Sequence, residues 1–92
     1  MSQIEADTDL ETILSTFWRK AEQAQAQGKD KEERAWLEAI VDLDEGDVAA
    51  WLALASLVPD ARERMQCYSQ VLQVAPGNPE AKQGLRQARR QL

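Results

Sequence analysis

The 92-residue sequence contains no histidine and a single cysteine, Cys67. Without histidine, the chain cannot form a Ser-His-Asp triad, use a histidine general base or supply the usual zinc ligand sets. A lone cysteine forms no disulfide within the chain, which fits a reducing compartment. We therefore expect a protein that is not an enzyme, with no catalytic residues, no bound metal and no cofactor.

Strand-favouring residues, proline and long apolar runs are also scarce. Ala, Leu, Glu, Gln and Arg dominate and proline occurs three times, a composition that predicts an all-helical fold. No apolar run approaches the roughly 20 residues that cross a bilayer. Residues 1–9 are acidic and polar, unlike the basic and then apolar start of a secretory signal. We expect a cytoplasmic protein without a membrane partner.

Charge is unevenly distributed along the chain, whose net charge is −5. Residues 1–60 carry 14 acidic and 5 basic side chains, a net of −9, whereas residues 61–92 carry 2 acidic and 6 basic side chains, a net of +4. The two parts could attract each other, or the basic part could attract another molecule.

Five segments have apolar residues at intervals of three and four, which predicts amphipathic helices. Their ranges are about 9–27, 31–43, 48–57, 61–74 and 79–91. Residues 1–7 show no such period and are predicted to form a flexible N-terminal arm before a helical domain at residues 8–92. The short connections predict that consecutive helices are antiparallel.

Side chains that can accept a backbone hydrogen bond precede each predicted helix. Thr8 with Glu11, and Asp30 with Glu33, form capping boxes for the first two helices. Gly28 is suited to the left-handed residue just beyond the first helix. Single caps for the last three helices are predicted at Asp47, Asp60 and Asn78.

The sequence contains an internal repeat. Residues 37–47 resemble residues 68–78 when the chain is shifted by 31 positions. The same shift places Ile40 over Val71 and Ala50 over Ala81. A fixed period in this range, made of two antiparallel helices, is typical of helical solenoids.

The second helix pair also carries a recognisable motif: an aromatic residue and a Leu-small pair, then an aromatic residue with two aliphatic residues, and a final proline. Its members are Trp51, Leu54, Ala55, Tyr68, Val71, Leu72 and Pro76. This pattern resembles the tetratricopeptide repeat family. A weaker copy is formed by Phe17, Ala21, Ala24, Gly28, Leu37, Ile40 and Val41. The resemblance covers residues 10–92 and implies two repeats and a closing helix, stacked as a short right-handed α-solenoid.

The chain departs from the family pattern in three places. Glu45 stands where the first repeat would have its proline, and Glu33 stands where a small residue is expected. The second pair is shorter than the usual repeat and has Val-Pro-Asp at residues 58–60, where a glycine is common. These departures affect the expected helix crossing more than the architecture.

In proteins of this family, the first helix of each pair lines a concave face that holds an extended peptide or a partner helix. The resemblance therefore implies an adaptor that binds another protein. It assigns seven residues to this face: Trp18, Glu22, Gln25, Leu52, Ser56, Gln83 and Gln87. Members that clamp a terminal carboxylate use Lys, Arg and Asn at such places, which the first two of these helices lack, so we expect a groove lined by apolar and amide groups.

Two other classes of partner remain open. Two helix pairs and one further helix fall below the roughly three repeats that a solenoid prefers, which favours self-assembly into a homo-oligomer. The last helix carries a basic patch of Lys82, Arg86, Arg89 and Arg90, which could bind an acidic protein or nucleic acid. Nucleic acid is disfavoured because this helix has no aromatic residue and the rest of the chain is acidic.

Two further features have simpler explanations. The acidic segment 42–47 suggests calcium, but an EF-hand counted from Asp42 would need glycine sixth and an acid twelfth, whereas Gly46 is fifth and Ala53 is twelfth. We interpret this segment as a solvated turn in which Asp47 is a helix cap. Cys67 lies in a helix without a histidine to lower its pKa, and we predict a small buried side chain.

The three tryptophans are the strongest lead to a binding surface. Trp51 matches a core position of the repeat. Trp18 is predicted either to pack on the second helix or to be exposed in the groove. Trp36 is predicted to pack against the fourth helix or to lie on the outer face.

Overall fold

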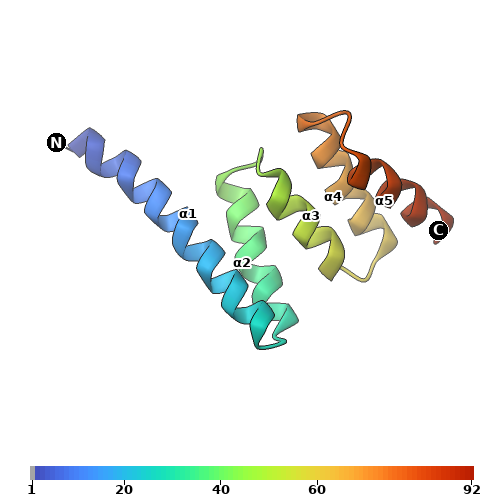
Figure 1. Cartoon of the computed structure of the whole chain (residues 1–92), viewed down its shortest axis with the longest axis horizontal. Coiled ribbons are helices and arrows are strands. Elements are labelled where there is room, and N and C mark those ends of the chain that lie inside the picture. The colour runs from blue at the N-terminus through green and yellow to red at the C-terminus, as the bar shows by residue number, and fades with distance from the viewer. Residues whose placement is uncertain (1) are drawn as a thin grey trace.

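A computed structural model describes the backbone of residues 2–92 and the side chains of residues 9–92. Within residues 2–92 the chain forms five α-helices (Figure 1), which confirms the predicted all-α fold. They are α1 (Ser2–Ala26), α2 (Asp30–Leu43), α3 (Val48–Leu57), α4 (Ala61–Val74) and α5 (Pro79–Arg90). None of these helices combines the length and the apolar character that crossing a membrane requires.

The beginning of α1 differs from the prediction. The helix starts at Ser2 and runs for 25 residues, so a start capped by Thr8 is wrong. Residues 2–8 contain neither glycine nor proline, and therefore nothing in their backbone chemistry interrupts the helix. Met1 and the side chains of residues 2–8 lie outside the described part, and the flexibility predicted for residues 1–7 stays a prediction.

The predicted caps of the last three helices are confirmed. Asp47 Oδ1 accepts a hydrogen bond from the Ala50 N–H at 3.1 Å, and Asn78 Oδ1 accepts one from the Ala81 N–H at 2.9 Å. Asp60 Oδ1 accepts one from the N–H two residues later at 3.2 Å. These bonds satisfy N–H groups that have no partner inside a helix, so the sequence fixes where α3, α4 and α5 begin.

The capping box predicted at Asp30 is wrong. Lys29 is the cap residue of α2 and makes no side-chain cap bond, while Asp30 is already in the first turn. Gly28 has φ +70°, as predicted for a left-handed residue, and the Lys29 N–H bonds to the Ala24 carbonyl at 2.9 Å. This tight backbone turn leads directly into α2, and Glu33 is buried instead of reaching back to the cap.

The helices pack in the order of the sequence. Each packs on the helix before and after it, and other helix pairs within residues 2–92 make at most marginal contact. Figure 1 shows α1, α3 and α5 running in one general direction, with α2 and α4 running back between them. The result is an elongated body measuring 52 × 31 × 17 Å, in which no helix is surrounded on all sides.

The core is built from a few large aliphatic side chains and many small ones. Leu37, Ile40 and Val71 are the largest fully buried side chains of the described residues. Helices α1, α3 and α5 contribute small buried residues, among them Ala21, Ala50 and Ala81. Small side chains let helix axes approach closely, which explains how short helices bury large residues on α2 and α4.

Candidate interaction surfaces

The seven residues predicted to line a groove lie on α1, α3 and α5. Glu22, Gln25, Ser56, Gln83 and Gln87 are exposed, and Trp18 and Leu52 are half-buried. All seven are therefore accessible to another molecule. The four hollows described below do not combine residues from α1, α3 and α5, so a shared groove stays a prediction.

Trp18 is positioned by a long-range hydrogen bond. Its indole Nε1–H donates to Asp47 Oδ2 at 3.3 Å, while the other oxygen of Asp47 caps α3. The carboxylate thus fixes both the start of α3 and the orientation of Trp18. The Trp18 ring packs against the core and is half-buried. Its exposure in a groove stays a prediction.

Trp51 is anchored from the same turn. Its Nε1–H donates to the Glu45 carbonyl at 2.8 Å, and its half-buried ring packs against the core, as predicted. Within this turn, Asp44 Oδ1 accepts a bond from the Gly46 N–H at 3.2 Å. The acidic segment thus stabilises its own turn and orients the indole rings of Trp18 and Trp51 through hydrogen bonds. Nowhere in the described part do three His, Cys, Asp or Glu side chains gather as a metal site would require.

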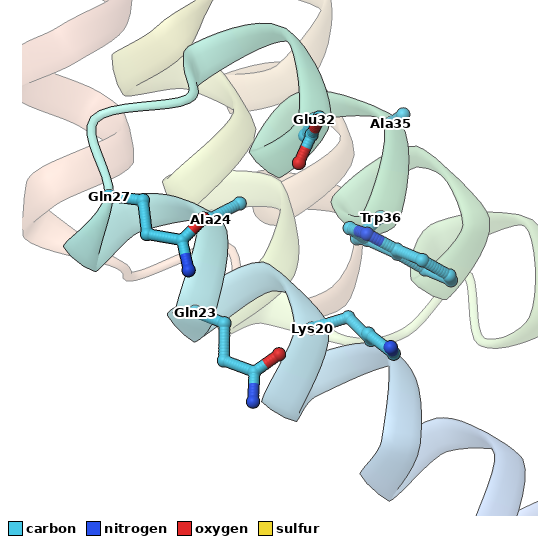
Figure 2. Close-up of a pocket in the computed structure, with 7 residues that line it drawn as sticks. All are labelled: Lys20, Gln23, Ala24, Gln27, Glu32, Ala35 and Trp36. Atoms are coloured by element: carbon cyan, nitrogen blue, oxygen red, sulfur yellow. The ribbon is translucent and has the colours of Figure 1, made fainter.

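Trp36 packs on α1. Its half-buried ring lies against Phe17, with ring centroids 5.2 Å apart and planes tilted by 47°. It also lines an open hollow of about 420 Å³ between α1 and α2. Figure 2 shows Lys20 and Gln23 of α1, and Gln27 directly after this helix, around the hollow. Sequence reasoning missed it because the side-by-side placement of α1 and α2 creates it.

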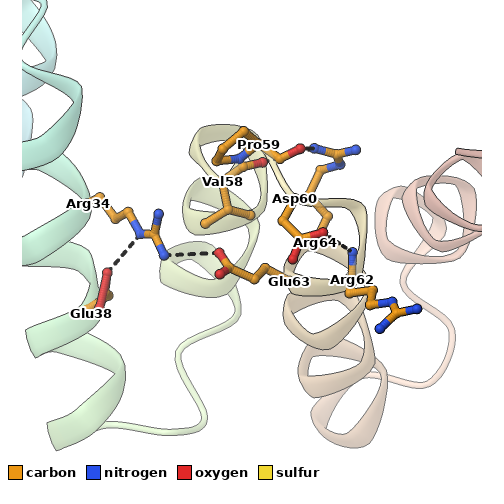
Figure 3. A network of polar contacts seen from close by, with 8 residues as sticks. All are labelled: Arg34, Glu38, Val58, Pro59, Asp60, Arg62, Glu63 and Arg64. Carbon is orange, nitrogen blue, oxygen red and sulfur yellow. Dashed lines mark hydrogen bonds and ion pairs between the residues drawn. The ribbon is translucent and has the colours of Figure 1, made fainter. Parts of the chain in front are cut away.

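A second hollow lies where α2, α3 and α4 meet. It has a volume of about 240 Å³ and is lined by Arg34, Glu38, Trp51, Leu54, Val58, Glu63, Gln66 and Cys67. The Arg34 guanidinium joins α2 to α4, since its Nη2 contacts Glu63 at 3.0 Å while its Nε contacts Glu38 at 2.9 Å (Figure 3). These groups are partly exposed, so the ion pairs position the helices more than they stabilise them.

Cys67 lines this hollow as a buried thiol. Its side chain is 6% exposed, which confirms the predicted burial. Burial raises the pKa of the thiol, and Glu63 raises it further. A thiol with a raised pKa is protonated at neutral pH and is a poor nucleophile.

The basic patch of α5 lies on the surface. Lys82, Arg86, Arg89 and Arg90 are exposed, and none of them forms an ion pair with a side chain of the described residues. Lys82, Arg86 and Arg90 follow at intervals of four and thus share one side of the helix, where like charges repel. An open hollow of about 370 Å³ lies along this side, lined by Gln83, Arg86, Gln87 and Arg90.

No family model matches this chain, and no curated protein matches it.

Proposed function

We propose that this chain is a helical-repeat module that binds other proteins, with an arrangement similar to the tetratricopeptide repeat. In this proposal α1–α2 and α3–α4 are successive repeats stacked as a short right-handed solenoid, and α5 closes the array. The equivalent positions of the 31-residue shift support it, because Ile40 and Val71 are both 0% exposed, as are Ala50 and Ala81. Equal burial at equivalent positions is expected when one structural unit is used twice.

The observation that carries the binding proposal is the partial exposure of two large apolar side chains. Trp18 on α1 and Leu52 on α3 are half-buried, and exposed Gln25 and Ser56 lie on the same two helices. A partner peptide or helix would bury the free sides of the apolar residues, while the polar side chains supply hydrogen bonds. Such a module acts by binding alone, as a cytoplasmic adaptor.

Peptides selected from a random displayed library against the wild-type chain provide the test. The dissociation constant of a selected peptide is measured by fluorescence anisotropy for wild type, Trp18→Ala and Leu52→Ala. We expect each substitution to weaken binding roughly tenfold or more, because truncation of a central apolar anchor typically removes more than about 1.4 kcal/mol of binding energy.

Val74→Ala is the matched control. Val74 is 49% exposed near the end of α4, outside the proposed groove, so its truncation should leave peptide affinity unchanged. Circular dichroism of all variants checks that helicity is retained. Equal affinity of wild type, Trp18→Ala and Leu52→Ala for the selected peptides would rule out the groove.

A further inference from the structure

The two ends of the elongated body combine exposed apolar side chains with charges of opposite sign. We define the acidic end by Asp9, Leu10, Glu11, Ile13 and Leu43, on α1 and at the end of α2. We define the basic end by Arg62, Met65, Arg89, Arg90 and Leu92, at the start of α4 and the end of α5. Figure 1 shows the first turns of α1 and the C-terminus on opposite sides of the molecule.

The acidic end arises because α1 is much longer than its partner, with 25 residues against 14 in α2. The antiparallel contact between Phe17 and Trp36 sets a register in which Leu10 lies at the level of Leu43, the last residue of α2. The apolar stripe of α1 thus reaches the end of α2, and Leu10, Ile13 and Leu43 remain 46%, 41% and 48% exposed.

The acidic end also has charge of one sign. Residues 1–11 contain four acidic and no basic side chains. Asp42, Asp44 and Glu45 are exposed at the same end of the α1–α2 pair. Pairing two copies through this end alone would therefore bring like charges together, which opposes association.

The basic end offers an apolar hollow beside cations. A hollow of about 430 Å³ is lined by Arg62, Met65, Gln66, Ser69 and Gln70 of α4 together with Leu92, which is 66% exposed. The Arg64 guanidinium contacts the Gln91 side chain and so ties the end of α5 to α4. Arg62 lines this hollow, and Arg89 and Arg90 precede Leu92 by three and two residues. All three arginines are exposed and make no ion pair within the described residues.

We propose that the acidic end of one copy binds the basic end of a second copy. The part of α1 that carries Leu10 and Ile13 occupies the hollow beside Met65 and Leu92, while Asp9 and Glu11 face the arginines. Both surfaces expose apolar groups that association would remove from water, and their charges are complementary. This contact uses different residues from the Trp18 and Leu52 groove, so the two proposals can fail separately.

Sedimentation equilibrium of the full chain tests the proposal. At low salt we expect the average mass to rise above that of the monomer with increasing concentration, and 0.5 M salt should reduce association because it screens exposed charges. The variant Arg89→Glu, Arg90→Glu should associate roughly tenfold more weakly, since it places acids against acids. Leu10→Gln should also weaken association without changing the charge.

The control variant is Lys20→Glu, Lys31→Glu, which changes the net charge by the same amount away from both ends and should associate like wild type. The sharpest test mixes two charge variants. Asp9→Lys, Glu11→Lys and Arg89→Glu, Arg90→Glu should each associate more weakly than wild type when alone and should associate strongly when mixed, because each supplies the charge that the other lacks.

Three results would overturn the proposal. The first is a wild-type chain that stays monomeric at every protein and salt concentration. This holds even if the monomer binds an acidic peptide of unrelated sequence, because the basic end would then serve another partner. Another is association that none of the end substitutions changes. The third is a mixture of the two charge variants that does not associate although each variant is helical by circular dichroism.

Discussion

Helices α1 and α5 lie at opposite ends of the array, and each packs chiefly on a single neighbour. They differ in which side chains they bury and which they expose. α5 turns Ala81, Gly84 and Ala88 towards α4 and exposes polar and basic side chains elsewhere. α1 buries Ala21 and Ala24 in its second half but leaves apolar residues exposed in its first half.

This difference shows what decides whether the apolar face of a terminal helix is buried or exposed. A helix that packs through alanine and glycine can bury its apolar face completely on one neighbour, because the small side chains bring the two axes close together. A helix longer than its neighbour keeps part of its apolar stripe exposed. Helix α5 itself therefore contributes close packing and charge, and the exposed Leu92 lies beyond its last residue, whereas the first half of α1 itself retains apolar surface for a partner.

The largest effect on stability is expected from truncating Ile40, a buried residue of α2, which packs on α1. Ile40 is 0% exposed, whereas Ile13, at the same level of the α1–α2 register, is 41% exposed. Ile40→Ala should destabilise the fold by about 2–5 kcal/mol through lost burial and a residual cavity. Ile13→Ala should cost about 0.5 kcal/mol or less in dilute solution. Urea unfolding followed by circular dichroism measures the free energy of unfolding of both variants. Equal losses of stability would contradict the difference in burial between Ile40 and Ile13.

The next largest effect concerns the close contact between α4 and α5. A Cβ atom at Gly84 would overlap the ring of Tyr68, whereas one at Gly77 would meet no atom within 4 Å. Gly84→Ala should therefore destabilise the fold by about 1–3 kcal/mol, because the ring or the helix must move. Gly77→Ala is the control and should have little effect on the unfolding midpoint. A harmless Gly84→Ala would contradict the close packing of α5 on α4.

The smallest effect is expected at Glu33, whose side chain is 8% exposed. Burial raises the pKa of its carboxyl, and nearby Asp30 raises it further. A carboxyl whose pKa is higher in the folded state stabilises the fold fully below its unfolded pKa, and this contribution is lost as pH rises through the folded pKa. Glu33→Gln should therefore unfold at a slightly higher temperature than wild type at pH 7, and this advantage should shrink at about pH 3.

Glu32→Gln provides the control for this comparison, because it removes the same charge from an exposed neighbouring position. Thermal unfolding at both pH values should show a pH-dependent gain for Glu33→Gln that exceeds the gain for Glu32→Gln. Identical pH profiles for the two variants would mean that Glu33 is solvated in the folded chain.

Prediction from sequence worked best where chemistry is local. The caps at Asp47, Asp60 and Asn78 act on N–H groups two or three residues away, so their roles can be read from the residue and its position. Prediction failed at Thr8 and Asp30, which have suitable side chains but are not used as caps. A suitable side chain permits a cap, whereas the path of the backbone decides whether the helix begins there.

The candidate surfaces were harder to predict because they depend on distant residues. The hydrogen bond from Trp18 to Asp47 crosses 29 positions of the chain, and so does the contact between Arg34 and Glu63. Periodicity placed these side chains on helix faces but could not identify their partners. The hollow beside Trp36 and the contact of Gly84 with Tyr68 have no sequence signal, because each depends on how closely two helices approach.

The sequence by itself determined that the described chain is helical, where most of its helices begin and end, and that its acidic and basic residues are separated along its length. Tertiary structure alone decided which apolar residues stay exposed and which side chains meet across the array. The physical reason is range. Helix periodicity and capping act over a few residues, whereas burial depends on the length and register of neighbouring helices, and only the folded arrangement fixes these.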